Sequence, residues 1–220
     1  MQLPDHVPVR LVLADDEALL RRGLRVLLEA DGRVEVVAEA ADGAALLDAV
    51  RRYRPDVALV DVQMPGMDGL AALRALLAWT NPPAVAVLTT FDLDDYVATA
   101  LELGAQGFLL KDAEPEALTR AVVDLAAGGA VLDPRITARL LPKFRTAGRF
   151  RQNPQLDNLS AREKQVLALL ANGRSNHAIA TSLGLSEATV KSYVSTVLTK
   201  LGVENRVQAA LVAHQVGGAW

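Results

Sequence analysis

One acidic residue, Asp61, stands where a short apolar run breaks into a turn rich in Pro and Gly. The run from Val57 to Val60 is apolar and β-rich without alternation, which predicts a parallel strand buried on both faces. Ligands of open α/β sheets bind at the carboxyl ends of the strands, so a carboxylate here is a candidate for chemistry. An Asp can also end a strand simply to begin a turn, and that interpretation stays open.

Further polar residues stand at the ends of other predicted strands. The carboxyl ends of parallel strands meet at one edge of a sheet, so we expect these residues to lie close to Asp61. Each could singly be an ordinary loop or capping residue, but their joint occurrence favours a site. They are Asp15 and Asp16 after the run 9–13, Thr89 after the run 84–88, and Lys111 after the run 107–110.

The expected cluster defines a particular chemistry. Three carboxylates at close quarters repel one another unless a cation neutralises them, and oxygen ligands without Cys or His favour Mg²⁺. Asp61 could then attack phosphorus as a nucleophile and form an acyl phosphate. Lys111 would stabilise charge on the transferred oxygens, and the Thr89 hydroxyl could donate a hydrogen bond to the product.

Alternating strands and helices must position these residues. The periodicity predicts five short apolar strands, each followed by an amphipathic helix, so the fold class is α/β with a doubly wound parallel sheet. Asp42 is the expected N-cap of the second helix and Asp92 that of the fourth. The predicted strands are 9–13, 34–38, 57–60, 84–88 and 107–110, and the helices follow them up to about residue 127.

Four motifs in this order resemble the receiver domain of two-component response regulators. They are ADDE at 14–17, DVQMPGMDG at 61–69, LTTFD at 88–92 and GFLLKD at 107–112. The resemblance covers residues 7–127 and implies a flavodoxin-like five-stranded sheet of order 2-1-3-4-5. It also implies a partner, a sensor histidine kinase, that supplies the phosphoryl group.

The resemblance assigns a role to each residue of the site. Asp61 would be the phosphoacceptor and Lys111 the phosphate-contacting lysine. Thr89 and Phe108 would form a switch pair. The Mg²⁺ ligands would be Asp16, Asp61 and the backbone carbonyl of Gln63, with Asp15 acting through water.

The second half of the chain has a different charge. Residues 1–127 hold 11 Lys and Arg against 21 Asp and Glu, whereas residues 156–220 hold 6 against 4. A mildly basic module suits a polyanionic partner. The 220 residues contain no Cys, no apolar stretch long enough for a membrane span and no signal-peptide pattern, so we expect a cytoplasmic protein with no membrane partner.

A linker is predicted over residues 128–155, with a short helix over about 134–141. Four helices follow within 156–217. The first opens with a capping box, Ser160-x-x-Glu163, and the next two begin at Ser175 and Ser186. Two short helices joined through Gly184 suit a helix-turn-helix.

This half resembles the LuxR-type DNA-binding domain of NarL and FixJ regulators. The resemblance implies that the helix from Ser186 to Lys200 enters the major groove of double-stranded DNA, with a homodimer on an inverted repeat. Two departures stand out, because Ala178 and Tyr193 occupy positions where the family usually has Glu and His. Ser195 is short for base readout. The implied DNA contacts are Thr189, Lys191, Ser192 and Ser195.

Three functions compete at this point. The leading one is a transcription factor whose dimerisation and DNA binding are controlled by phosphorylation of Asp61. An aspartyl-phosphate phosphatase similar to the haloacid dehalogenases would need a second Asp two residues after the nucleophile, where this chain has Gln63. A DNA-binding protein with an inactive receiver is disfavoured because every charged residue of the site is present. We therefore predict a regulator and not an enzyme with external substrates.

Overall fold

The structure is a computed structural model of the whole chain, and it describes residues 7–89, 94–133, 135–136, 154–203 and 205–215. The chain divides into two compact units, Met1–Ala126 and Ala127–Trp220. Each unit is described by itself below.

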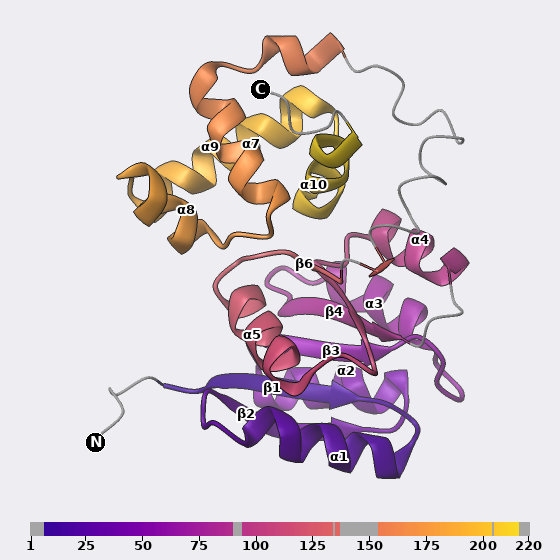
Figure 1. Cartoon of the computed structure of the whole chain (residues 1–220). Coiled ribbons are helices and arrows are strands. Elements are labelled where there is room, and N and C mark those ends of the chain that lie inside the picture. Colours follow the sequence, from indigo (N-terminus) through magenta and orange to yellow (C-terminus); the bar gives the residue numbers. More distant parts are fainter. Residues whose placement is uncertain (1–6, 90–93, 134, 137–153, 204, 216–220) are drawn as a thin grey trace, which may run out of the picture. The chain divides into compact units, whose positions relative to one another are not determined.

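The first unit is built on a parallel sheet whose strands alternate with helices (Figure 1). The strand order within this unit is β2-β1-β3-β4-β5, so the predicted order of the five strands is confirmed. These strands are β1 (Val9–Ala14), β2 (Val34–Ala40), β3 (Val57–Asp61), β4 (Ala84–Thr89) and β5 (Gly107–Leu110). A further strand of two residues, β6 (Val131–Leu132), falls within the range of the second unit.

The sheet is covered by helices on both faces, as a doubly wound fold requires. Helix α1 packs beside α5, and α3 packs between α2 and α4. All five residues of β3 are buried, which explains why its sequence is apolar without alternation. The helices are α1 (Ala18–Glu29), α2 (Gly43–Tyr53), α3 (Gly69–Leu77), α4 (Asp94–Leu103) and α5 (Pro115–Ala126).

Register brings the ends of the central strands level. Ala14 pairs with Val60, and Asp61 pairs with Leu88 on β4. Asp15 comes directly after β1, so its side chain leaves the sheet at the same edge as that of Asp61. The parallel pairing thus turns distant parts of the sequence into neighbours.

Side-chain caps fix where the helices begin. Asp42 accepts a hydrogen bond from the Ala45 N–H at 2.8 Å, which confirms the predicted cap of α2. Asp68 caps α3 in the same way, through the Ala71 N–H at 2.7 Å. The predicted cap of α4, Asp92, lies outside the described residues.

The second unit is mainly helical (Figure 1), and its helices enclose one apolar core. Ser160 and Glu163 form the predicted capping box, in which each side chain accepts a backbone N–H of the other residue. Gly184 ends α8 with φ of 64°, a left-handed conformation that favours glycine. The elements are the 3₁₀-helix η1 (Pro154–Asn158) and the α-helices α7 (Ala161–Ala171), α8 (Asn176–Leu183), α9 (Glu187–Leu201) and α10 (Arg206–Gln215).

Two further predictions concern segments that the structure describes only in part. Of the short helix expected over about 134–141, only residues 135–136 are described, and most of the linker 128–155 is likewise outside the described ranges. Among the described residues, no helix is long and apolar enough to cross a membrane.

Candidate functional site

An acidic cluster lies at the carboxyl edge of the sheet. Asp15, Asp16 and Asp61 each offer an oxygen within 4.8 Å of the others. Asp15 is fully buried, Asp61 is 4% exposed, and Asp16 is exposed. The loop after β1 supplies the first two carboxylates and the last residue of β3 supplies the third, so the structure brings together the predicted acidic residues.

Lys111 joins this cluster from the end of β5. Its Nζ lies 2.9 Å from Asp61 Oδ2 and 2.8 Å from Asp15 Oδ2. Burial is the largest single influence on the Lys111 pKa and lowers it, but the hydrogen bonds and charges of Asp15 and Asp61 together raise it above its ordinary value. The ammonium is therefore charged, and it is one cation among three carboxylates.

The pKa of Asp61 is raised above that of an ordinary Asp. Burial is the main cause, because it disfavours the ionised form, and the nearby Asp15 charge adds to it. Lys111 opposes the shift, as does a long hydrogen bond of 3.4 Å from the Gln63 N–H to Asp61 Oδ1. The site thus holds more negative charge than its own lysine balances.

The residues present fit a hard divalent cation. Their donor atoms are oxygens, and a cation would relieve the excess negative charge. Asp15 and Asp61 both contact Lys111 through Oδ2. Oδ1 of Asp15 also accepts the Glu17 N–H at 2.8 Å, whereas Oδ1 of Asp61 has only the long 3.4 Å contact from the Gln63 N–H. Oδ1 of Asp61 and the exposed Asp16 carboxylate are therefore more open to a cation than Asp15.

This arrangement predicts a pH dependence of stability. The free energy of unfolding of the metal-free protein should fall as pH rises from about 3.8 through the raised folded-state pKa of Asp61. Below that range the carboxyl is neutral in both states, and above it the folded state holds an ionised group that it stabilises less well than the unfolded chain does. Urea unfolding in the presence of a chelator measures this. The free energy of unfolding of the parent minus that of Asp61→Asn should decrease as the pH rises.

The control for this experiment is Asp48→Asn, since the Asp48 side chain is 80% exposed. Its difference from the parent gives the effect of an Asp→Asn change at an exposed position. A difference for Asp61→Asn that does not decline with pH would contradict the raised pKa. Saturating Mg²⁺ should suppress the decline if the cation binds at Asp61.

Gly69 is a residue of the site that the sequence reasoning missed. Its N–H donates to the Val62 carbonyl at 2.9 Å, which folds the loop after β3 back onto the strand. A Cβ on Gly69 would lie 2.0 Å from the Asp61 carbonyl oxygen, so the chain can close here only without a side chain. The available signal was the glycine at the end of the DVQMPGMDG motif.

Thr89 and Phe108 lie on neighbouring strands, β4 and β5. Thr89 is the last residue of β4 and is 1% exposed, and its carbonyl accepts the Lys111 N–H at 2.9 Å. Phe108 is fully buried and pairs with Val87, two residues before Thr89. The proposed switch pair therefore shares one corner of the sheet with Lys111.

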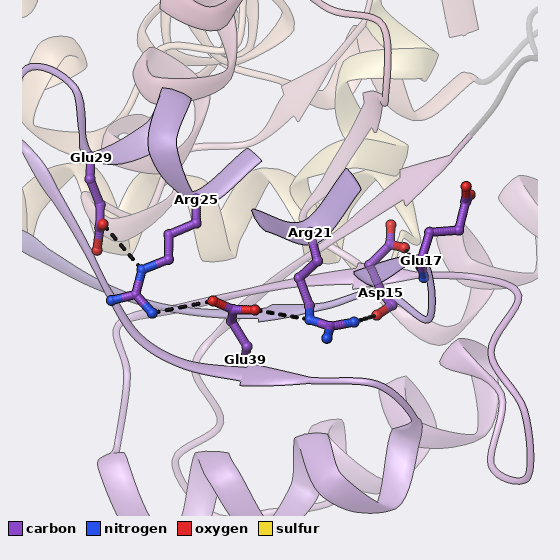
Figure 2. A network of polar contacts seen from close by, with 6 residues as sticks. All are labelled: Asp15, Glu17, Arg21, Arg25, Glu29 and Glu39. Carbon is purple, nitrogen blue, oxygen red and sulfur yellow. Dashed lines mark hydrogen bonds and ion pairs between the residues drawn. The ribbon is translucent and has the colours of Figure 1, made fainter. Parts of the chain in front are cut away.

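A chain of ion pairs next to the acidic cluster also escaped the sequence reasoning (Figure 2). Arg21 of α1 lies between the carboxylate of Glu39 on β2 and the carbonyl of Asp15. Arg25 extends the chain from Glu39 to Glu29. Arg21, Arg25 and Glu29 are four residues apart on α1, but Glu39 comes from β2, so only the fold shows that the four charges form one network.

In the second unit, the helix α9 carries the predicted DNA contacts on its exposed side. Thr189, Lys191, Ser192 and Ser195 are exposed, whereas the buried residues of α9 are Val190, Val197 and Leu201. The Thr189 N–H donates to the Ser186 hydroxyl oxygen at 3.1 Å, which places Thr189 in the first turn. Tyr193 packs partly against the core, so it belongs to the side that faces the other helices.

A buried arginine, also missed from the sequence, braces the helix-turn-helix. Arg206 at the start of α10 donates to the Arg174 carbonyl at 2.6 Å, in the loop between α7 and α8, and to the Gly128 carbonyl. Burial lowers the pKa of Arg206 to about 10. The guanidinium stays charged at neutral pH and ties the loop before α8 to α10.

Comparisons with known proteins identify the family of each half of the chain. Residues 11–123 match the response regulator receiver domain, and residues 157–213 match the bacterial regulatory proteins of the luxR family. The chain belongs to the two-component response regulators that join a receiver to a LuxR-type DNA-binding domain.

Particular relatives cover nearly the whole chain. It is 40% identical to the DNA-binding transcriptional activator DevR/DosR of Mycobacterium tuberculosis, over 94% of this chain and 95% of that protein. It is also 40% identical to the nitrate/nitrite response regulator NarP of Escherichia coli, over 99% of this chain and 100% of that protein. The crystal structure of the response regulator ChrA covers 96% of this chain and 98% of its own, with 39% identity and a TM-score of 0.55.

Proposed function

We propose that Asp61 is the phosphoacceptor through which a sensor histidine kinase controls this regulator. The observation that carries the proposal is the buried Asp61 carboxylate, 2.9 Å from Lys111 and beside two further carboxylates. An Asp61 oxygen would form the new bond to phosphorus as the bond to the donor breaks, and Lys111 would stabilise the charge on the phosphoryl oxygens.

A Mg²⁺ ion at this site would neutralise the phosphoryl oxygens during transfer. We propose Asp16, Asp61 and the Gln63 carbonyl as its protein ligands, with Asp15 acting through water. The oxygen donors and the excess negative charge of the cluster support this assignment.

We further propose that the chain does not turn over external substrates. The position two residues after Asp61, where an aspartyl-phosphate phosphatase needs an acid, holds Gln63. An inactive receiver is not favoured either, because the carboxylates and Lys111 are assembled at contact distance.

For the second unit we propose sequence-specific binding to double-stranded DNA through α9. The contacts would come from Thr189, Lys191, Ser192 and Ser195. Phosphorylation would favour a homodimer, because two-fold pairing on an inverted repeat doubles the few contacts of one small domain. The structure of the response regulator RcsB in complex with DNA supports this, because it resembles this chain with a TM-score of 0.56 and 28% identity over 96% of this chain.

We propose that the receiver spans residues 7–127, the linker 128–155 and the DNA-binding domain 156–217. A regulator that binds DNA works in the compartment that holds the DNA, so we propose a cytoplasmic location.

One experiment tests the proposal as a whole. The full chain is incubated with acetyl phosphate and Mg²⁺, and DNA sites are then selected from a random pool by the treated and the untreated protein. We expect one phosphoryl group per chain, a selected inverted repeat and a higher affinity after treatment. Equal affinity for that repeat before and after complete phosphorylation would contradict the control of DNA binding by Asp61.

Thr89→Ala should separate phosphorylation from its effect. The variant should accept phosphate from acetyl phosphate but gain little affinity for DNA, because it lacks the hydroxyl that would hold the transferred group. We expect it to lose at least about 1 kcal/mol of the coupling between the two events. Thr89→Ser keeps the hydroxyl and should respond like the parent. If phosphorylated Thr89→Ala bound DNA as tightly as the phosphorylated parent, the switch role would be wrong.

Lys191→Ala should show whether Lys191 reads a base. A lysine that contacts a guanine edge gives about 1–3 kcal/mol of discrimination, so the variant should weaken on the selected repeat and much less on random DNA. A lysine that contacts only phosphate would weaken both alike and reduce the salt dependence by about one ion. Titrations on both DNAs at two salt concentrations distinguish these outcomes, and no change on either DNA would show a solvated residue.

A further inference from the structure

Arg21 makes the contact between the ion-pair network and the acidic cluster (Figure 2). Its side chain is 14% exposed. One guanidinium nitrogen, Nε, pairs with Glu39 Oε2 at 3.0 Å, and another, Nη1, donates to the carbonyl oxygen of Asp15. A single planar group thus links the edge strand β2 to the loop that carries two of the three carboxylates.

The Asp15 carbonyl belongs to the peptide unit that joins Asp15 to Asp16. That unit is planar, so fixing its oxygen also fixes the plane from which both residues project. The N–H of Asp15 is held separately, by the Ala40 carbonyl at 3.1 Å. Arg21 therefore determines the orientation of the one peptide plane that leads from the buried Asp15 to the exposed Asp16.

We propose that Arg21 is a positioning residue for the cation site, acting through the Asp15–Asp16 peptide and touching neither the ion nor the phosphoryl group. This inference rests on the proposed function, since it concerns the same Mg²⁺ site. Arg21 would hold the Asp16 carboxylate in the direction needed for binding, so that the loop is not free to turn it towards solvent.

Glu39 of β2 holds Arg21 directly with one carboxylate oxygen, and it uses the other to contact Arg25 Nη1 at 3.2 Å. Arg25 Nε in turn lies 3.2 Å from Glu29, whose other oxygen accepts the Val36 N–H at 2.9 Å. The guanidinium of Arg21 is therefore held by Glu39 itself, whereas Arg25 reaches it only through Glu39. Lysine could not replace it, because an ammonium lacks the flat fork that reaches two acceptors at once.

The sign of the effect distinguishes positioning from simple charge. Arg21 is a cation near a cation site, so if its charge alone mattered, its removal would make Mg²⁺ bind more tightly. If Arg21 positions the loop, its removal weakens Mg²⁺ binding despite that electrostatic gain. The charge-conserving variant Arg21→Lys separates the two cases, because it keeps the charge and loses the geometry.

The experiment titrates the full chain with Mg²⁺ alone and measures the dissociation constant by calorimetry. We expect Arg21→Met and Arg21→Lys each to weaken binding about tenfold, the lower end of the range for residues that orient metal ligands. The matched control is Arg25→Met, because Arg25 contacts the same Glu39 but not Asp15. This variant should leave the dissociation constant unchanged. The Glu17 N–H donates to Asp15 Oδ1 in the same loop, so its hydrogen exchange should become faster in the Arg21 variants and not in the control.

Each outcome decides the matter. Weaker binding in both Arg21 variants, with an unchanged control, supports positioning. Tighter binding in Arg21→Met with no change in Arg21→Lys overturns it in favour of charge, and equal losses in all three variants overturn it in favour of general destabilisation. If Arg21→Met does not fold, Arg21→Lys alone still decides between weakened and unchanged binding.

The parent protein tests the proposed function separately. A parent that neither binds Mg²⁺ nor accepts phosphate refutes the proposed function itself. If the parent does both and the Arg21 variants bind Mg²⁺ as tightly as the parent, only the inference about Arg21 is refuted.

Discussion

Asp61→Asn is expected to abolish incorporation of phosphate from acetyl phosphate, to the level of a sample without donor, while the protein stays folded. The amide is isosteric with the carboxylate but lacks the nucleophilic oxygen that would form the acyl phosphate. Folding persists because Lys111 retains its partner Asp15 at 2.8 Å. Intact-protein mass measurement after incubation with acetyl phosphate and Mg²⁺ gives the result directly.

Two controls make this prediction specific. Asp48→Asn removes an exposed carboxylate elsewhere in the same unit and should label like the parent. Chelation of Mg²⁺ should suppress labelling of the parent, since the cluster would then lack the cation that offsets its charge. Undiminished labelling of Asp61→Asn would move the phosphoacceptor to another residue.

Gly69→Ala should be the most destabilising single methyl group in the receiver. Its Cβ would stand 2.0 Å from the Asp61 carbonyl oxygen and 3.0 Å from the Cα of Val62, and both are backbone atoms that cannot rotate away. Either β3 or the start of α3 must move. We expect a loss of about 4 kcal/mol or more in the free energy of unfolding, which is exceptional for one substitution.

Gly23→Ala is the matched control, because a Cβ there meets nothing within 4 Å. Gly23 is exposed within α1, where alanine should stabilise the helix by about 0.5–1 kcal/mol. Urea unfolding of both variants therefore gives opposite signs for the same chemical change. A loss below about 1 kcal/mol for Gly69→Ala would mean that the loop relaxes easily.

Local signals in the sequence predicted most of the fold. The buried strand β3 follows from a continuous apolar run, and the start of α7 follows from the Ser160 capping box, because both depend on residues close together in the chain. Helix α3 ends at Leu77, a boundary that periodicity does not fix, since the last turn of a helix has no strong pattern of its own. The two-residue strand β6 is too short to leave any periodic signal.

The site was predictable as a set of strand ends and not as a set of contacts. Parallel strands bring Asp61 and Lys111 to one edge whatever the side chains between them, so their meeting follows from topology. The support from Arg21 could not be predicted, because it depends on the reach of one side chain to a carbonyl in another element. The tight closure at Gly69 likewise depends on the path of a whole loop.

The near burial of Asp61, at 4% exposed, also bears on how long a signal lasts. Hydrolysis of a phosphorylated Asp61 requires a water molecule to approach the phosphorus opposite the bond that breaks. Asp61 is enclosed by β3 and Lys111, whereas Glu17 and Gln63, which are near it in the described part of the site, are exposed. Substitutions at these two exposed residues would therefore be expected to lengthen or shorten the lifetime of the active state without altering the residues that perform the transfer.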